Sequence, residues 1–264
     1  MKKYIIILEL LLFIIINNSL IVITNYDIYT DKIDNEIKIV QVSDLHNKSF
    51  GIKQYKLINK IKKINPDLIV VTGDLIDANH TDIDSSIAFI ERALNYAQVY
   101  YVTGNHESWG LDSYNSLKIK MEKLGVIILD NKSIDVEIEN NLIEILGVDD
   151  ANMVNVKTEL DNLEYEDSTF NLLLTHRPEL FSIYQNRNID LVLTGHAHGG
   201  QFRIPFIGGL IAPDQGFFPE YSEGMFESNN TKMIVSRGLG NSIIPIRINN
   251  NPELVVVNIK HLDR

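Results

Sequence analysis

Short apolar runs alternate with helical patterns along the chain from residue 37 onward. Runs rich in Ile, Leu and Val predict buried strands, whereas apolar residues spaced three or four apart predict amphipathic helices. Strands are predicted at residues 37–42, 68–71, 99–102 and 126–129, and helices at residues 54–64, 85–96 and 111–124. Regular alternation of strands and helices is typical of a mostly parallel sheet with helices on its faces.

The second half of the chain is richer in strand patterns. Residues 133–138 and 142–147 predict a hairpin around Asn140 and Asn141. Further strands are predicted at residues 172–174, 191–193, 233–235 and 254–259. We therefore expect an α/β fold in which two sheets pack face to face between outer helices, giving four layers, α/β/β/α. These layers would form one domain over residues 37–264.

The N-terminal residues differ from the rest of the chain because they are almost entirely apolar. Residues 4–24 contain one charge, Glu9, and would span about 31 Å as a helix, which is enough to cross a bilayer. Lys2 and Lys3 before this run favour an N-terminus inside the cell. The pattern predicts a transmembrane signal-anchor helix over residues 1–25 and a polar tether over residues 26–36. The protein would cross the cell membrane once, with its main domain on the extracytoplasmic side.

Two other interpretations of this segment stay open. A cleaved signal peptide is less favoured, because no small-x-small cleavage site follows the apolar run. A buried amphipathic helix of the main domain is favoured by Glu9 and by the Asn17-Asn18 pair, since a carboxylate inside a bilayer is costly.

Composition and charge narrow the classes of function. The 264-residue chain is 45% hydrophobic and 22% charged, as in globular proteins with a sizeable core. Its formal net charge of −11 argues against nonspecific binding to nucleic acid, which needs clustered Lys and Arg. The chain contains no Cys, which excludes disulfides and thiolate metal sites.

Polar residues able to bind metal follow five of the predicted strands. They are found in the motifs Ser43-Asp44-Leu45-His46, Gly73-Asp74, Gly104-Asn105-His106-Glu107, Thr175-His176 and Gly195-His196-Ala197-His198. In open α/β sheets, ligands bind outside the carboxyl ends of the strands, so these five loops are able to converge on one site. Each motif alone is weak evidence, because Asp and Gly are common in turns. Their agreement in position and chemistry indicates a metal site.

The donor set of this site contains two carboxylates, one amide and four imidazoles. Nitrogen and oxygen donors without sulfur suit Mn, Fe, Zn or Ni. Seven ligands are too many for one ion, and they suit two divalent ions about 3.5–4 Å apart, bridged by one carboxylate and a hydroxide. Such ions would reverse the local negative charge, so that an acidic protein is able to bind an anionic phosphate.

In this order, the five motifs resemble those of the calcineurin-like metallophosphoesterases, over about residues 37–259. Residues 195–201 and 236–242 resemble the bacterial YkuE/YaeI-like branch, whose members tend to be membrane-associated or exported. The resemblance implies a first metal held by Asp44, His46 and His198, and a second held by Asn105, His176 and His196, with Asp74 bridging both. It also implies that His106 is catalytic, as a general acid or as a hydrogen-bond donor to phosphate, and that Glu107 orients it.

The implied protein is a metallophosphoesterase sandwich that hydrolyses a phosphomonoester or phosphodiester by attack of the metal-bridging hydroxide. The predicted anchor favours a lipid-linked or envelope-linked phosphate near the membrane, and the protein is expected to be a monomer. One alternative is a nucleotide or pyrophosphate hydrolase of the same fold. Another is a membrane-tethered binding module without catalysis, which the complete ligand set disfavours.

Two features near the predicted ligands have more than one interpretation. Arg177 follows His176 and is either a surface charge or a contact for phosphate. An aromatic cluster lies between the last predicted ligand and the final strands, and its members are Phe202, Phe206, Phe217, Phe218 and Tyr221. This cluster is either a small core that covers a loop, or an apolar rim for an acyl chain or a membrane.

Overall fold

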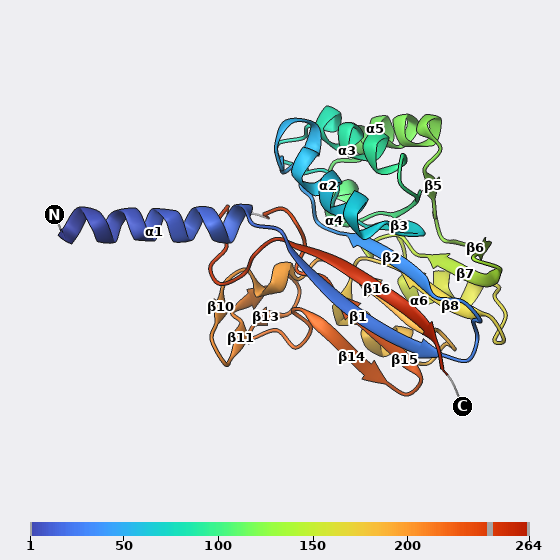
Figure 1. Cartoon of the computed structure of the whole chain (residues 1–264). Coiled ribbons are helices and arrows are strands. Elements are labelled where there is room, and N and C mark those ends of the chain that lie inside the picture. The colour runs from blue at the N-terminus through green and yellow to red at the C-terminus, as the bar shows by residue number, and fades with distance from the viewer. Residues whose placement is uncertain (1, 242–244, 263–264) are drawn as a thin grey trace.

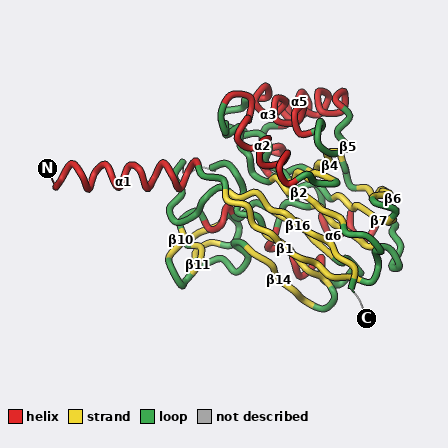
Figure 2. Tube along the Cα trace, in the orientation of Figure 1, coloured by secondary structure: helices red, strands yellow, loops and turns green. Residues whose placement is uncertain are grey.

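Two six-stranded sheets form the centre of the molecule (Figures 1 and 2). The computed structural model describes residues 2–241 and 245–262. Met1 of the predicted anchor, Ser242 at the end of the 236–242 motif and the last two residues of the predicted domain lie outside the described residues.

The first sheet has the strand order β1-β16-β2-β3-β4-β5. Its strands are β1 (Val22–Thr30), β2 (Ile37–Val42), β3 (Leu68–Thr72), β4 (Gln98–Val102), β5 (Ile127–Ile128) and β16 (Glu253–His261). Strands β2 to β5 run parallel, and β16 is antiparallel to β2. The helices between the parallel strands are α2 (Tyr55–Ile64), α3 (Ile83–Ala93), the short α4 (Asn105–Trp109) and α5 (Leu111–Leu124).

The second sheet has the strand order β14-β15-β9-β8-β7-β6. Its strands are β6 (Lys132–Ile138), β7 (Asn141–Gly147), β8 (Phe170–Leu174), β9 (Leu191–Thr194), β14 (Gly224–Ser228) and β15 (Thr231–Val235). Strands β7, β8, β9 and β15 run parallel, whereas β6 and β14 form antiparallel edges. The helices of this half are α6 (Val156–Asn162) and α7 (Phe181–Tyr184).

Three apolar clusters separate four layers. One lies between the two sheets and joins Ile39 and Val70 of the first sheet to Leu172 of the second. The next residues along the strands, such as Val40, point to the opposite face of the first sheet, where α2, α3 and α5 pack. The third cluster covers the outer face of the second sheet. The α/β fold expected from the strand and helix patterns is confirmed, and its layers are α/β/β/α.

Several short elements were not predicted from the sequence. Besides α4, α6, α7 and β14, they include the 3-10 helices η1 (Ile52–Gln54), η2 (Pro178–Leu180) and η3 (His198–Gly200). Two small hairpins follow η3, one formed by β10 (Arg203–Ile204) and β11 (Gly208–Gly209), the other by β12 (Ile211–Ala212) and β13 (Gly216–Phe217). Runs of two residues are too short to give a periodic signal.

The segment after the N-terminal helix differs from the polar tether predicted over residues 26–36. Strand β1 pairs in parallel with β16 over nine residues, from Val22 opposite Glu253 to Thr30 opposite His261. Ile28 and Ile33 are buried and pack in the cluster between the sheets. Residues 22–33 therefore belong to the body of the domain, because their apolar side chains complete its core.

The N-terminal helix α1 (Lys2–Ser19) projects from the body (Figure 1). Its apolar side chains are exposed at residues 4–8, 11–13, 15 and 16. Within the described part of the chain, no helix has the combined length and apolarity required to cross a membrane. The transmembrane helix predicted over residues 1–25 is therefore not supported. The helix stops at Ser19, contains Glu9, and is followed by a strand that starts at Val22, so that the predicted 21-residue span is not one helix.

Candidate metal centre

All five predicted motifs lie at carboxyl ends of parallel strands. Asp44 and His46 follow β2, Asp74 follows β3, and Asn105 begins α4 after β4. His176 follows β8, and His196 and His198 follow β9 in the second sheet. Because the two sheets pack face to face, their strand ends share one edge and the loops meet there. All seven predicted ligands are buried there.

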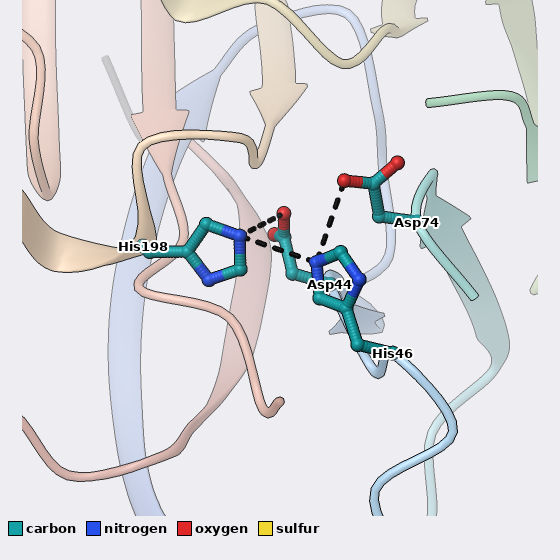
Figure 3. A group of neighbouring side chains, drawn as sticks. All are labelled: Asp44, His46, Asp74 and His198. Atoms are coloured by element: carbon teal, nitrogen blue, oxygen red, sulfur yellow. Dashed lines mark hydrogen bonds and ion pairs between the residues drawn. The ribbon is translucent and has the colours of Figure 1, made fainter. Parts of the chain in front are cut away.

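The first group of side chains comprises Asp44, His46, Asp74 and His198, and its potential donor atoms lie within 4.8 Å of one another (Figure 3). The Nε2 atoms of His46 and His198 are 3.2 Å apart. Nε2 of His198 lies 3.4 Å from a carboxylate oxygen of Asp44, and Nε2 of His46 lies 3.4 Å from Asp74 Oδ2. Two imidazoles and two carboxylates therefore converge on one small volume.

The second group contains Asp74, His176 and His196. Nε2 of His176 lies 3.4 Å from Asp74 Oδ2, 3.2 Å from Nδ1 of His196 and 3.1 Å from Oδ1 of Asn105. The Asn105 amide oxygen therefore faces this group. The same oxygen of Asp74 approaches a histidine of each group, so Asp74 is common to both.

A backbone carbonyl sets the orientation of the His176 ring. Nδ1 of His176 lies 2.8 Å from the carbonyl oxygen of Thr72, an acceptor, so Nδ1 carries the proton that it donates. Nε2 then has a lone pair in the neutral ring, directed at the shared space. This arrangement is typical of metal-binding histidines, whose second ring nitrogen is held by a carbonyl or carboxylate.

His106 lies beside the first group, and its ring centroid is 4.4 Å from that of His46. Nδ1 of His106 accepts a hydrogen bond of 3.1 Å from the backbone N–H of Ala78. In the neutral ring the proton is therefore on Nε2, which makes His106 a hydrogen-bond donor there. Asp77 lies 4.0 Å from Nδ1 of His106 and was not identified from the sequence.

Glu107 joins two of the loops rather than contacting the His106 ring. Its carboxylate accepts hydrogen bonds from the backbone N–H groups of Gly104, Asp74, Leu75 and Ile76, at 2.8 to 3.3 Å. It thereby fixes the loop after β3 against the loop after β4. Burial, together with the nearby Asp74 charge, raises the pKa of Glu107 to about 7.

The electrostatics of the cluster fit a cation. Burial tends to raise the pKa of the Asp74 carboxyl, but the histidines around Asp74 hold that pKa well below its usual value. Burial lowers the pKa of His176, but the carboxylates around it, Asp74 above all, raise it to about 10. Burial also lowers the pKa values of His46 and His198, which favours neutral rings. Carboxylates that attract positive charge, beside neutral imidazoles with free lone pairs, are the donors that divalent metals need.

The backbone of the centre is unusual. Five of the seven predicted ligands have positive φ angles, and they are Asp44, His46, Asp74, His196 and His198 at 46 to 65°. Only a few per cent of residues other than Gly adopt this conformation, and such strain is concentrated at functional sites. The strain supports a functional role for these loops.

Glycines next to the ligands allow the loops to approach one another. A Cβ atom on Gly195 would lie 1.9 Å from Oγ of Ser43, and one on Gly104 would lie 2.3 Å from an oxygen of Asp74. Any side chain at these positions would displace a predicted ligand or its neighbour.

An ion-pair network adjoins the second group. Arg177 is buried and donates to Asp150, with distances of 2.6 Å from Nε and 3.0 Å from Nη2. Arg177 also pairs with Asp214, whose Oδ2 lies 2.9 Å from Nε2 of His196. Arg177 is therefore neither a surface charge nor an unpaired contact for phosphate.

Sequence reasoning missed Asp150 and Asp214. Asp150 follows β7 and carries the same strand-end signal as the predicted ligands. Asp214 lies in the turn between β12 and β13, and no local pattern connects it with His196.

Comparison with known proteins agrees with this geometry. Residues 37–200 match the family described as calcineurin-like phosphoesterase. The chain is 34% identical over 231 residues to the uncharacterized metallophosphoesterase YkuE of Bacillus subtilis (strain 168), covering 84% of this chain and 79% of the relative. It is 30% identical over 257 residues to an uncharacterized metallophosphoesterase of Aquifex aeolicus (strain VF5), covering 90% and 91%. A Danio rerio relative, the transmembrane protein with metallophosphoesterase domain, is 28% identical over 244 residues, and the match covers 86% of this chain and 54% of that protein.

Fold, clustered donors and relatives together define a metal-dependent phosphoesterase, a hydrolase that acts on phosphoester bonds. The chain belongs to the calcineurin-like phosphoesterase family and to its YkuE-like branch.

Proposed function

We propose that the protein binds two divalent metal ions and hydrolyses a phosphomonoester or phosphodiester. Asp44, His46 and His198 would hold the first ion, and Asn105, His176 and His196 the second. The observation that carries this proposal is the position of Asp74, because one of its oxygens lies 3.4 Å from a histidine of each group. Ions bound there would activate water and neutralise the charge of the phosphoryl group.

His106 is proposed as the catalytic donor beside the metals. Its Nδ1 is occupied by the N–H of Ala78, so the donor atom is Nε2. Proton donation to the leaving oxygen contributes about 10²–10⁴-fold to such reactions. Glu107 is proposed to act on the centre indirectly, because its carboxylate holds the backbone around Asp74 and Gly104.

We further propose that the substrate is a lipid-linked or envelope-linked phosphate. Support comes from α1, whose apolar side chains have no covering partner among the described residues, and which therefore favours association with a membrane. The Danio rerio relative, described as a transmembrane protein, is consistent with a membrane setting.

The experiment is a metal-reconstitution assay with the full chain. Protein stripped with a chelator is assayed on p-nitrophenyl phosphate and bis(p-nitrophenyl) phosphate, with and without Mn²⁺. Activity should depend on added metal, and Asp74→Ala should lower it by about a hundredfold or more, as for other electrostatic stabilisers of a transition state. Metal-independent hydrolysis, or full activity of Asp74→Ala, would contradict the proposal.

A pair of histidine variants tests the role of His106. His106→Ala should lose about 10²-fold or more on alkyl phosphoesters, and less on nitrophenyl esters, whose leaving group needs no proton. His80→Ala is the matched control, because His80 is exposed and outside the centre. Equal losses on both kinds of ester would exclude general-acid catalysis by His106. Relative rates on lipid phosphates and on nucleotides then separate the proposed substrate class from a nucleotide or pyrophosphate hydrolase.

A further inference from the structure

The aromatic cluster identified in the sequence divides into a buried and an exposed part. Tyr221 packs edge-on against Phe181 and Phe226 in the outer core, as the covering interpretation predicts. Other apolar side chains of the two small hairpins are exposed instead. The docking surface consists of Phe206 and Ile207, at the tip of the β10–β11 hairpin, and of Phe217 and Phe218, at the end of β13, with exposed fractions of 109%, 65%, 71% and 61%.

The backbone holds two of these side chains outward at a cost. Phe206 has φ 69° and Phe218 has φ 54°, a conformation that bulky residues rarely adopt. A hydrogen bond of 3.1 Å from Ile207 N to Ile204 O closes the tip of the β10–β11 hairpin, and one of 2.9 Å from Phe218 N to Leu210 O joins the open ends of the β12–β13 hairpin. Strained loops that present apolar side chains to water have no evident benefit for folding, so a binding role is indicated.

The docking surface is also uncharged. Residues 203–218 contain only two charged side chains, Arg203 and Asp214. Arg203 donates to the carbonyl of Gly199 at 3.0 Å and pairs with Glu223, while Asp214 pairs with Arg177 at the metal centre. Both charges are therefore paired within the domain, although Asp214 in the β12–β13 turn is itself 56% exposed, and the docking surface consists of apolar side chains.

The docking surface is continuous with the base of α1. Asn18, near the end of α1, accepts a hydrogen bond of 2.9 Å from the backbone N–H of Arg247. On the same loop, the carbonyl of Ile248 accepts a hydrogen bond of 3.0 Å from the backbone N–H of Arg203. The carbonyl of Ile246 accepts one of 2.7 Å from the side-chain amide of Gln201. The side chains of Ile246 and Ile248 are themselves exposed. The loop of residues 245–248 thus joins the end of α1 to the hairpins, and in Figure 1 the β10–β11 hairpin lies near the base of α1.

The exposed apolar side chains of α1 identify the partner of the docking surface. Large apolar side chains are exposed at consecutive positions from Tyr4 to Leu8 and again from Leu11 to Phe13, which covers every side of the helix. A protein partner or a second copy of this chain would cover one side. A lipid bilayer is able to contact apolar side chains on all of these sides.

We propose that the docking surface inserts into the same bilayer as α1 and presents the metal centre to phosphoesters at the lipid headgroups. Asp214 connects the two regions, because it lies in the β12–β13 turn, close to Phe217 in sequence, and its carboxylate is 2.9 Å from His196. The bilayer contact itself follows from the surface, whereas its catalytic consequence rests on the proposed phosphoesterase function.

Because the chain has no Cys, single introduced cysteines allow a direct test. An environment-sensitive fluorophore is attached in the full chain at Phe206→Cys, Phe218→Cys or, as a control, Leu142→Cys, an exposed apolar position on β7, next to the far edge strand β6 of the second sheet. The probes are vesicles of phosphatidylglycerol and phosphatidylethanolamine. On vesicles, the fluorescence emission of labels at 206 and 218 should shift to the blue, and iodide should quench it several-fold less. The label at 142 should show neither change. Unchanged quenching at 206 and 218, with the protein sedimenting on the vesicles through α1, would overturn the proposal.

A second variant separates this inference from the proposed function. The triple variant Phe206→Ser, Phe217→Ser, Phe218→Ser should hydrolyse bis(p-nitrophenyl) phosphate with Mn²⁺ as the unaltered chain does, but with its hairpins detached from vesicles. A label at Ile207→Cys reports this detachment. On vesicles, iodide should quench its fluorescence several-fold more in the triple variant than in the chain with all three Phe residues. If the unaltered chain shows no metal-dependent hydrolysis while its labels are protected, the proposed function fails and the bilayer contact stands. Protection of the label in the triple variant would overturn the assignment to these side chains.

Discussion

At the residue scale, hydrogen bonds from neighbouring groups decide which ring nitrogens point into the centre. The Thr72 carbonyl fixes His176, and the Ala78 N–H fixes His106 in the opposite sense. One ring is thus prepared to accept a metal, and the other to donate a proton. Chemically identical side chains a few ångströms apart therefore have different proposed roles because their partners differ.

Glu107 provides a prediction at this scale. Each of its oxygens accepts from two backbone N–H groups, so Glu107→Gln would leave the new amide group facing two donors. Unpaired buried donors cost about 1–3 kcal/mol each, and we expect a loss of about 2–5 kcal/mol in the free energy of unfolding. Urea unfolding of the metal-free protein measures this loss.

Glu122→Gln is the matched control for that measurement, because Glu122 is exposed on α5. We expect it to change the free energy of unfolding by less than about 0.5 kcal/mol, as is usual for surface substitutions. A Glu107→Gln variant as stable as the control would show that the carboxylate does not join the two loops.

The residue types of the centre were predictable from the sequence, but several of their contacts were not. Asp44, Asp74, Asn105 and the histidines follow strand ends, and this position in the chain is what indicates a shared site. The positive φ angles of the ligands and the contact of Asp214 with His196 depend on packing between segments distant in the chain. Such contacts leave no trace in local sequence patterns.

At the element scale, β1 makes the segment after α1 part of the first sheet. Its residues resemble a continuation of the apolar run, yet they pair along the whole of β16. The helix and strand patterns between residues 37 and 102 predicted their elements well, because both faces of those strands are covered and the runs are mostly apolar. An edge strand such as β1 alternates between exposed and buried residues, and neither a helix nor a tether pattern distinguishes it.

Two truncations test the role of β1. A chain starting at Leu20 lacks α1 only and should lose about 1–3 kcal/mol in the free energy of unfolding, because it gives up the hydrogen bonds of Asn18 with Arg247 and of Ile16 with Asn251, at about 0.5–1.5 kcal/mol each. A chain starting at Asn35 also loses Ile28 and Ile33 from the core between the sheets. Truncating one buried Ile to Ala costs about 2–5 kcal/mol, so this chain should lose more than about 4 kcal/mol. Equal stability of the two chains, measured by urea unfolding, would mean that β1 is dispensable.

At the scale of the whole molecule, the two sheets, α1 and the hairpins place chemistry and apolar surface together. The sheet edges supply the buried metal-binding side chains, while η3 and the hairpins after it connect them to the docking surface. A net charge of −11 would repel an anionic phosphate from the rest of the surface. Metal ions at the shared edge would provide the opposing charge.

The central claim is that two metal ions share Asp74, and anomalous X-ray diffraction tests it most directly. Crystals of the full chain grown with Mn²⁺ should show two anomalous peaks about 3.5–4 Å apart, one on each side of the Asp74 carboxylate. One peak should lie against His46 and His198 and the other against His176 and His196. A single peak, or two peaks that do not both contact Asp74, would contradict the account.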